Sequence, residues 1–293
     1  MRTRKIDLFR NFRRKSPAEV ALYCFVSLVF MVVALSYVYI LVWAVMAGLK
    51  THTEIIMKPF ALPEVWHWEH YVEMITALEV NGSNFLDMLF NSVVFSVWAT
   101  FATQFITLQF AYVCTKYKFP GSKLVFPIIL TVMTLPLYGT GGGMYKLYYN
   151  LGLIDSYKQL LVVGSVTHVG TMYYMAYFQN LSWTYAEAAK IDGANEFQTY
   201  YKVMMPQAKP IFGALFLTNW ISSWNDYTSA MIYHPKLPTL AYGIYQFNTE
   251  MIYRARMDIL FAGCVAILIP ALILFIAFNK TITSNVSLGG IKG

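Results

Sequence analysis

Residues 187–206 read EAAKIDGANEFQTYYKVMMP and lie between two long apolar reaches of the chain. The charged side chains of this segment are Glu187, Lys190, Asp192, Glu196 and Lys202. The run AEAAK favours a helix, for which Thr184 and Glu187 form a capping box. Gly193 is well suited to end that helix in a left-handed conformation. The sequence therefore predicts a short helix that ends at a glycine turn.

A second short helix is predicted after this turn. Asn195 and Gln198 can form its capping box, and Pro206 is expected to close it. Residues 184–206 are thus predicted to form a helix hairpin. Without further pattern, such a hairpin also fits a passive surface connection.

The composition indicates a protein of the lipid bilayer. Hydrophobic residues make up 57% of the chain and charged residues only 13%, outside the range that is usual for a soluble domain. Several reaches with few or no charges are long enough to cross a hydrocarbon core of roughly 30 Å as helices. They predict an all-α membrane protein with six transmembrane helices, at about 20–48, 88–114, 124–146, 159–180, 210–233 and 258–279.

Lysine and arginine residues predict the orientation of these spans. With a cytoplasmic N-terminus, 15 of the 22 basic residues fall on the cytoplasmic side, as short basic loops normally do. Both termini and the hairpin 184–206 are then cytoplasmic. Residues 1–18 form a basic N-terminal segment, and 19–293 form one transmembrane domain. Ser16, Pro17 and Glu19 predict a capped start for the first helix.

Motifs for catalysis are missing from the sequence. It contains no nucleotide phosphate loop, no GxSxG, no HExxH and no GxGxxG after a strand, so we expect no enzyme activity. His67, His70 and Glu73 in HWEHYVE are better explained by a structural surface helix than by a metal site, and no metal is expected. Cys24 and the other two cysteines, Cys114 and Cys264, are predicted to pack as small apolar residues.

The sequence resembles the integral-membrane subunits of ATP-binding-cassette importers, specifically carbohydrate-uptake permeases of the maltose type. Their EAA loop has the form E-A-A-x-x-D-G-A, which reads EAAKIDGA at 187–194, and VMMP at 203–206 matches its end with Met205 in place of the common Leu. FNSVVFS, KFPGSK, NLGLIDSY, SSWNDY and SLGGIKG also look familial, and the likeness covers roughly residues 88–293. The glycine run in LPLYGTGGGMY departs from the pattern, which affects the expected helix geometry of the third span.

The resemblance implies a role for the hairpin as the element that couples transport to ATP hydrolysis. Glu187 would pair with a basic residue in a groove of the ATPase, small side chains would allow close docking, and Gly193 would provide the bend. The expected coupling residues are Glu187, Ala188, Ala189, Asp192, Gly193 and Pro206. ATP and Mg would bind to the partner ATPase, with no cofactor on this chain.

The resemblance also implies partners and a location. The partners are a second, homologous permease, two ATPase subunits, an extracytoplasmic solute-binding protein that faces the loop 234–256, the carbohydrate and membrane lipid. No nucleic-acid partner is expected. The location is the bacterial cytoplasmic membrane. The tail 287–293 is similar to family tails that approach the ATPase, although a disordered end explains it almost as well.

Polar and aromatic residues form adjoining stripes along the predicted fifth span. Aromatic faces beside hydroxyl and amide groups suit a sugar, although packing against neighbouring helices explains the stripes equally well. Asp226 could accept a hydrogen bond from sugar, act as a gate or pair with the partner permease. The substrate-path residues expected from these stripes are Asn219, Trp220, Ser223, Trp224, Asp226 and Tyr227, with Ser222 and Ser229 on the same face. His168 in the fourth span is a weaker candidate.

The predicted function is therefore that of a permease subunit that moves a sugar or oligosaccharide into the cytoplasm by alternating access. An importer of the same architecture for a polyol phosphate or osmolyte is the first alternative. A secondary transporter driven by an ion gradient is less favoured, because Asp226 alone lies well inside a span and no internal repeat is detected.

Overall fold

The computed structural model describes residues 16–135, 140–162, 164–254 and 256–286, and in these ranges the protein is built from helices without a named strand. An all-helical fold agrees with the prediction. The helices are α2 (Pro17–Gly48), α3 (His52–Met57), α4 (Glu69–Ala77), α5 (Phe85–Lys116), α6 (Ser122–Thr134), α7 (Thr140–Asn150), η1 (Tyr157–Leu161), α8 (Val169–Asn180), α9 (Thr184–Ile191), α10 (Glu196–Gln198), η2 (Thr199–Met204), α11 (Met205–Gln207), α12 (Lys209–Trp224), α13 (Tyr227–Tyr233), α14 (Leu240–Arg254) and α15 (Met257–Val286).

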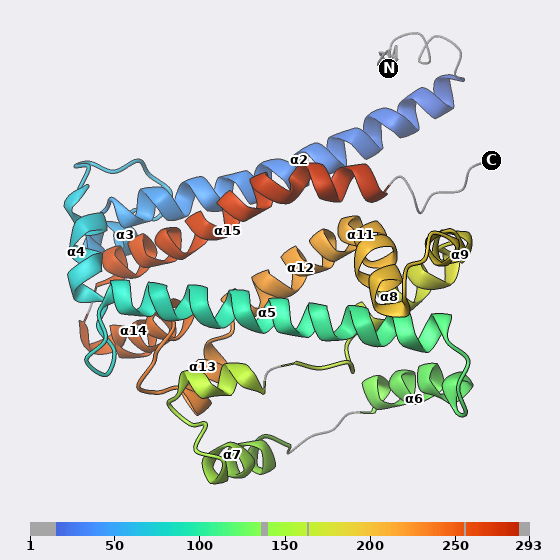
Figure 1. Ribbon diagram of the computed structural model, residues 1–293. Helices are drawn as coiled ribbons and strands as arrows, with labels where there is room; N and C mark the ends of the chain where they lie inside the picture. The colour runs from blue at the N-terminus through green and yellow to red at the C-terminus, as the bar shows by residue number, and fades with distance from the viewer. Residues whose placement is uncertain (1–15, 136–139, 163, 255, 287–293) are drawn as a thin grey trace.

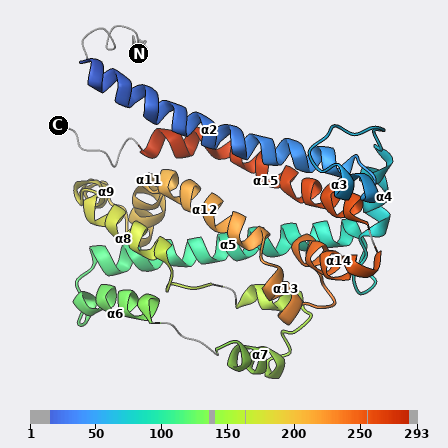
Figure 2. The same ribbon diagram turned by 180° about the vertical axis from the view of Figure 1, so that it is seen from behind.

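Three of these helices are long and apolar enough to cross a membrane: α2, α5 and the first part of α15, residues 257–277. They coincide with the predicted first, second and sixth spans. The start of α2 follows the predicted cap, because Ser16 and Glu19 form a capping box with Pro17 in the first turn. α2 and α15 pack side by side, and most of α2 is exposed apolar surface, as expected for a helix that meets lipid (Figure 1; Figure 2).

The predicted third span is not one continuous helix. α6 ends at Thr134, Leu135 has an extended backbone, and α7 begins at Thr140. Leu135 precedes Pro136, and a proline disfavours helical geometry in the residue before it. The glycine run predicted to affect this span lies in the first turn of α7, except for Gly139, which is outside the described residues.

The predicted fourth and fifth spans are also divided. In the fourth, the 3₁₀-helix η1 ends at Leu161 and α8 begins only at Val169, with Gly164 at a φ of +150° between them. In the fifth, α12 ends at Trp224 and α13 begins at Tyr227. The prediction of one helix for each of these spans is therefore wrong, and the number of six crossings stays a prediction.

Two buried clusters hold the helices together. The first joins α4, α5, α12, α14 and α15, and the second joins α5, α6, α8 and the segment from α9 to α11. The start of α2 and the end of α15 lie at the end of the molecule that carries α9, whereas α3, α4 and α14 lie at the opposite end (Figure 1). We call these the α9 end and the α4 end.

Candidate functional site: the hairpin at the α9 end

The predicted hairpin is present, with α9 as its first arm. Gly193 has a φ of +84°, and the chain closes the helix with bonds from the Gly193 N–H to the Lys190 carbonyl at 3.0 Å and from the Ala194 N–H to the Ala189 carbonyl at 2.9 Å. This is the left-handed glycine turn that the sequence predicted. The predicted capping box at the start of α9 is wrong, because α9 has Trp183 at its N-cap position without a side-chain cap.

The second arm starts as predicted and continues further than predicted. Asn195 and Gln198 form a capping box at the start of α10. Pro206 does not close this arm, because it lies in the first turn of α11, where its missing N–H is not needed. The helical path runs from α10 through the π-helix η2 and α11 towards α12, so the second arm leads directly into the predicted fifth span.

A polar contact ties the two arms together. Glu196 forms an ion pair with Lys190 at 2.5 Å and accepts a hydrogen bond from the Tyr117 hydroxyl at 2.6 Å. The bonds from Lys190 and then Tyr117 lower the pKa of the Glu196 carboxyl. The Lys190 ammonium also lies 5.5 Å from the centre of the Trp183 ring. Glu196 therefore links α10 to α9 and to the end of α5.

The hairpin has a buried inner face and an exposed outer face. Ala186 and Ala189 are buried, and Ala186 belongs to the second cluster, where Tyr200 packs on Tyr112 of α5 with ring centres 4.6 Å apart. On the outer face, the predicted coupling residues Glu187, Ala188, Asp192 and Gly193 are exposed. Thus the small side chains at 186 and 189 let α9 approach the bundle closely, while both acids stay accessible.

A hollow of about 500 Å³ opens beside α9. Two strongly exposed apolar side chains lie near it in sequence, Ile191 at 87% and Phe197 at 68%. Exposed apolar patches with a polar rim are typical of protein contact surfaces. The hollow is lined by Ser182, Thr184, Tyr185, Ala188, Ala189, Asp192 and Val203.

The substrate-path residues of α12 divide into buried and accessible ones. Trp220 and Trp224 are each 2% exposed and belong to the first cluster, where the Trp224 indole N–H donates to the Ile267 carbonyl at 3.2 Å. Asn219 donates within its own helix to the Leu215 carbonyl at 2.9 Å. Ser223 is half-buried. A part for these residues in a substrate path stays a prediction.

The predicted single stripe from Asn219 to Ser229 is wrong, because the helix breaks at Asp226. The Asp226 carboxylate accepts a bond from the Ser229 N–H at 2.9 Å and so caps α13. Asparagine and aspartate compete with helical hydrogen bonds in this way, which explains the break after Asn225. Tyr227, the first residue of α13, stacks on Tyr245 of α14 with ring centres 4.3 Å apart.

A buried polar face on α5 was missed by the sequence reasoning. Gln104 accepts a hydrogen bond from the Tyr174 hydroxyl at 2.7 Å, and Thr107 bonds the His168 ring at 2.8 Å, which satisfies the histidine within the bundle. The signal was available, because several of these polar residues recur four positions apart inside an apolar helix. The buried members are Asn91, Ser92, Ser96, Thr100, Gln104 and Thr107.

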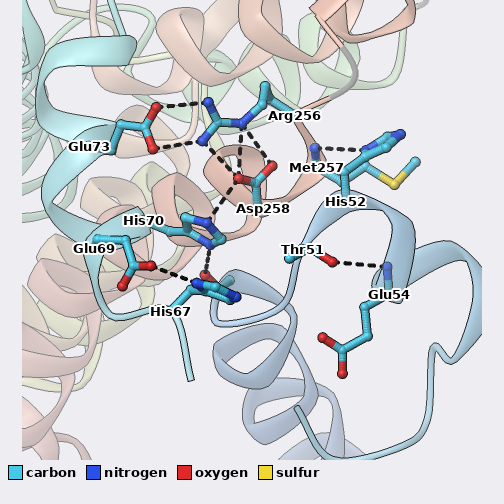
Figure 3. Close-up of polar contacts among 11 residues, drawn as sticks. Thr51, His52, Glu54, His67, Glu69, His70, Glu73, Arg256, Met257 and Asp258 are labelled. Carbon is cyan, nitrogen blue, oxygen red and sulfur yellow. Dashed lines mark hydrogen bonds and ion pairs between the residues drawn. The ribbon is translucent and has the colours of Figure 1, made fainter. Parts of the chain in front are cut away.

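A second polar group, drawn in Figure 3, lies around α4, at the end of the molecule opposite the hairpin (Figure 1). His67, His70 and Glu73 of HWEHYVE are found here. Arg256, just before α15, pairs with Glu73 of α4 and with Asp258 of α15, and His70 lies 3.4 Å from the same Asp258 carboxylate. His67 instead contacts Glu69 at 2.6 Å. His70 and Glu73 therefore help join α4 to α15, as structural residues would.

The predicted packing role of the cysteines holds only in part. All three thiols are free, and Cys114 is half-buried. Cys24 of α2 and Cys264 of α15 are exposed on this chain, so neither packs in its interior.

The long apolar helices and the exposed hairpin at one end define an integral membrane protein of the helical class. The chain belongs to the family of binding-protein-dependent transport system inner membrane components, which matches residues 108–287. This confirms the resemblance seen in the sequence.

Individual relatives extend the likeness over nearly the whole chain. The arabinooligosaccharides transport system permease protein AraQ of Bacillus subtilis is 28% identical over 96% of this chain and 99% of its own length. The diacetylchitobiose uptake system permease protein NgcG of Streptomyces coelicolor is also 28% identical, over 85% of this chain and 82% of its own. A chain from the crystal structure of a bacterial importer of alginate has the same fold, with a TM-score of 0.75 at 21% identity, covering 91% of this chain and 98% of that one.

Proposed function

We propose that this chain is the membrane-spanning permease subunit of an ATP-driven importer that brings a sugar or oligosaccharide into the cytoplasm. A second, homologous permease, two ATPase subunits and an extracytoplasmic binding protein complete the assembly. ATP and Mg bind to the ATPase subunits, and this chain supplies the path and the coupling element. The observation that carries the proposal is the exposed hairpin with the EAAKIDGA sequence, in a chain of the binding-protein-dependent transport family.

The hairpin is suited to transmit force from an ATPase. Its outer face offers Glu187 and Asp192 to a basic groove, and the Lys190–Glu196 pair holds its two arms in one geometry. Its inner face packs on the end of α5, and its second arm continues into α12. A push on α9 therefore reaches two different parts of the bundle, as a change from inward-facing to outward-facing requires.

The same arrangement supports the proposed orientation in the membrane. The start of α2 and the end of α15 lie at the α9 end (Figure 1), which supports the proposal that the hairpin and both termini share one side of the membrane. An ATPase works in the cytoplasm, and with a cytoplasmic N-terminus the sequence predicts 15 of the 22 basic residues on that side. The α9 end is cytoplasmic, and the α4 end faces the binding protein.

The substrate class rests on the relatives. AraQ and NgcG carry names that specify transport of arabinooligosaccharides and uptake of diacetylchitobiose. Sugars share apolar ring faces and a rim of hydroxyl groups, which aromatic and amide side chains of this chain can meet. We therefore assign a sugar or oligosaccharide, with its length and identity set by the binding protein.

The test is purification of the tagged chain from its native membrane in mild detergent, followed by assay of ATP hydrolysis. Wild type is expected to bring down an ATPase, a second permease and a binding protein, and the Glu187→Ala variant is expected to retain much less ATPase. Glu79→Ala is the matched control, because Glu79 is an exposed acid just before α5 at the α4 end. A chain that purifies alone and moves solute on an ion gradient would refute the proposal.

A further inference from the structure

We propose that a hollow between α13, α14 and α15 is a carbohydrate subsite of this chain, with the stacked rings of Tyr227 and Tyr245 as its platform. The inference rests on the proposed import of a sugar. It locates the contact between this subunit and that sugar. It also moves the expected contact away from the α12 stripe, since Trp220 and Trp224 lie in the core. The hollow has a volume of about 470 Å³, within the range of roughly 300–1,000 Å³ that is usual for small-molecule sites.

The break in the predicted fifth span creates this hollow. Because Asp226 caps α13, the chain turns after Asn225 and brings Tyr227 against Tyr245 of α14. The two rings lie 4.3 Å apart and within 14° of parallel, and both side chains remain more than a third exposed. A stacked pair is a stiff apolar plate of the kind on which the C–H face of a sugar ring packs.

Amide groups stand beside the aromatic plate. Asn248 lies one turn after Tyr245 on α14, and Asn225 lies at the end of α12. Within the described part of the chain, no hydrogen bond engages the Asn248 amide or the hydroxyls of Tyr227 and Tyr245. The Asn225 amide N–H₂ donates to the Ile221 carbonyl at 2.8 Å, which leaves its oxygen as an acceptor. These groups supply donors and acceptors for sugar hydroxyls.

The chemistry of the lining favours a neutral polyhydroxyl ligand. Among the residues that the structure describes, no charged side chain lines the hollow, so none of them would offset the cost of burying an anion or a cation. The remaining lining is small or aliphatic and comes from Ala241, Ile244, Leu260, Cys264 and Ile267. An aromatic plate with neutral amides and hydroxyls is the combination that matches a sugar.

Cys264 provides a reporter inside the hollow. It is exposed and lines the hollow from α15, and it would be the last thiol left in this subunit after Cys24→Ser and Cys114→Ser replacements. The sugar for the experiment is the one that the binding protein holds most tightly among arabinotriose, galactotriose, diacetylchitobiose and maltotriose. The assembled transporter in proteoliposomes would be treated with N-ethylmaleimide in the presence of this sugar. At ten times the half-saturating sugar concentration, alkylation of Cys264 is expected to be about tenfold slower.

Transport by variants gives an independent measure. Tyr245→Ala and Asn248→Ala are expected to raise the half-saturating sugar concentration for uptake about tenfold, and Tyr245→Phe, which keeps the ring, much less. Tyr149→Ala is the control, because Tyr149 also stacks on a tyrosine, Tyr145, but on α7 and outside the hollow. Its uptake is expected to match wild type.

The outcomes separate this inference from the proposed function. If wild type imports a sugar but Cys264 is not protected and both alanine variants keep wild-type half-saturation, the subsite is refuted and the importer stands. If Tyr245→Ala loses the second permease on purification, the hollow is a subunit contact and the subsite is likewise refuted. If wild type hydrolyses ATP in response to a binding protein but imports none of the sugars, the proposed substrate class fails first.

Discussion

Arg256 holds Glu73 in a two-point ion pair, with Nη1 to Oε1 and Nη2 to Oε2 both at 2.8 Å, although the residues are 183 positions apart. The same guanidinium contacts Asp258, whose side chain is only 4% exposed, at 2.8 Å. Arg256 thus joins the loop helix α4 to the start of α15 (Figure 3). Because a planar guanidinium donates along two directions at once, a lysine could not replace it in both contacts.

Arg256→Ala is therefore expected to destabilise the protein more than Glu73→Gln. Loss of the arginine leaves the buried Asp258 carboxylate poorly paired and should cost about 1–3 kcal/mol, whereas the Glu73 pair is partly exposed and should contribute about 0–1 kcal/mol. Thermal unfolding in detergent, followed by tryptophan fluorescence, measures the difference. Lys118→Ala, which removes an exposed cation at the α9 end, serves as the control. Equal losses for both variants would contradict the central position of Arg256.

The Glu73 contact should also depend on pH. The hydrogen bonds from Arg256 lower the pKa of the Glu73 carboxyl below its ordinary value of 4.5. A lowered carboxyl pKa stabilises the fold above the ordinary value, and this contribution is lost as the pH falls through the lowered one. The stability difference between wild type and Glu73→Gln should accordingly be present at neutral pH and be lost as the pH falls below 4.5 and through the lowered pKa of Glu73. A stability difference that persists unchanged in acid would show that the negative charge of Glu73 does not contribute to stability.

His234 should also make the fold sensitive to acid, because protonation would place a positive charge on a buried ring. Its side chain is 5% exposed and packs on Phe95, and burial lowers its pKa from 6.5 to about 4. Between these values the unfolded chain binds a proton that the folded chain does not, so stability declines as the pH falls from 6.5 to about 4. His234→Phe should remove part of this decline in unfolding measurements over that range. An identical decline in the variant would show that protonation of His234 does not cause the loss of stability.

Much of the hairpin could be predicted from sequence because its signals are local. Gly193 and the Asn195 and Gln198 cap act through neighbouring backbone groups, and both lie where they were expected. The ion pair of Lys190 with Glu196 was not expected, because it depends on how the glycine turn folds the second arm back on the first. Pro206 was misread because proline ends one helix and begins another with equal ease.

The divided spans were harder to predict. A long apolar reach indicates a segment that can lie in the bilayer, but it does not indicate whether one continuous helix forms there. Leu135 before Pro136 carried a recognisable break signal, whereas the cap that Asp226 forms competes with an equally good helical pattern. Trp220 and Trp224 were candidates for a path because they adjoin hydroxyl and amide groups, and packing against neighbouring helices explained their spacing equally well. Only the arrangement of α5, α12 and α15 around them decides which face is buried.

Trp220 tests that distinction directly. It is 2% exposed, and its replacement by alanine should leave a large cavity in the first cluster and cost about 3–5 kcal/mol of stability. Asn219→Ala, one position away, removes only a bond within α12 and should cost less than about 1 kcal/mol. Unfolding measurements of both variants check the prediction. A Trp220→Ala protein of wild-type stability with weaker sugar uptake would instead restore the tryptophan to the substrate path.

Gly193 offers the sharpest test of the coupling hairpin. Its φ of +84° suits glycine, and a Cβ added there would meet no atom within 4 Å, so the cost of Gly193→Ala comes from the backbone alone and should be about 1–2 kcal/mol. Gly193→Asn should cost less, because asparagine tolerates the left-handed region. If the turn shapes the surface to which the ATPase binds, Gly193→Ala should bring down less ATPase than Gly193→Asn does. Both variants should retain the second permease. Equal recovery of the ATPase with the two variants would mean that the turn contributes no geometry to docking, and would leave the exposed acids Glu187 and Asp192 to carry the contact.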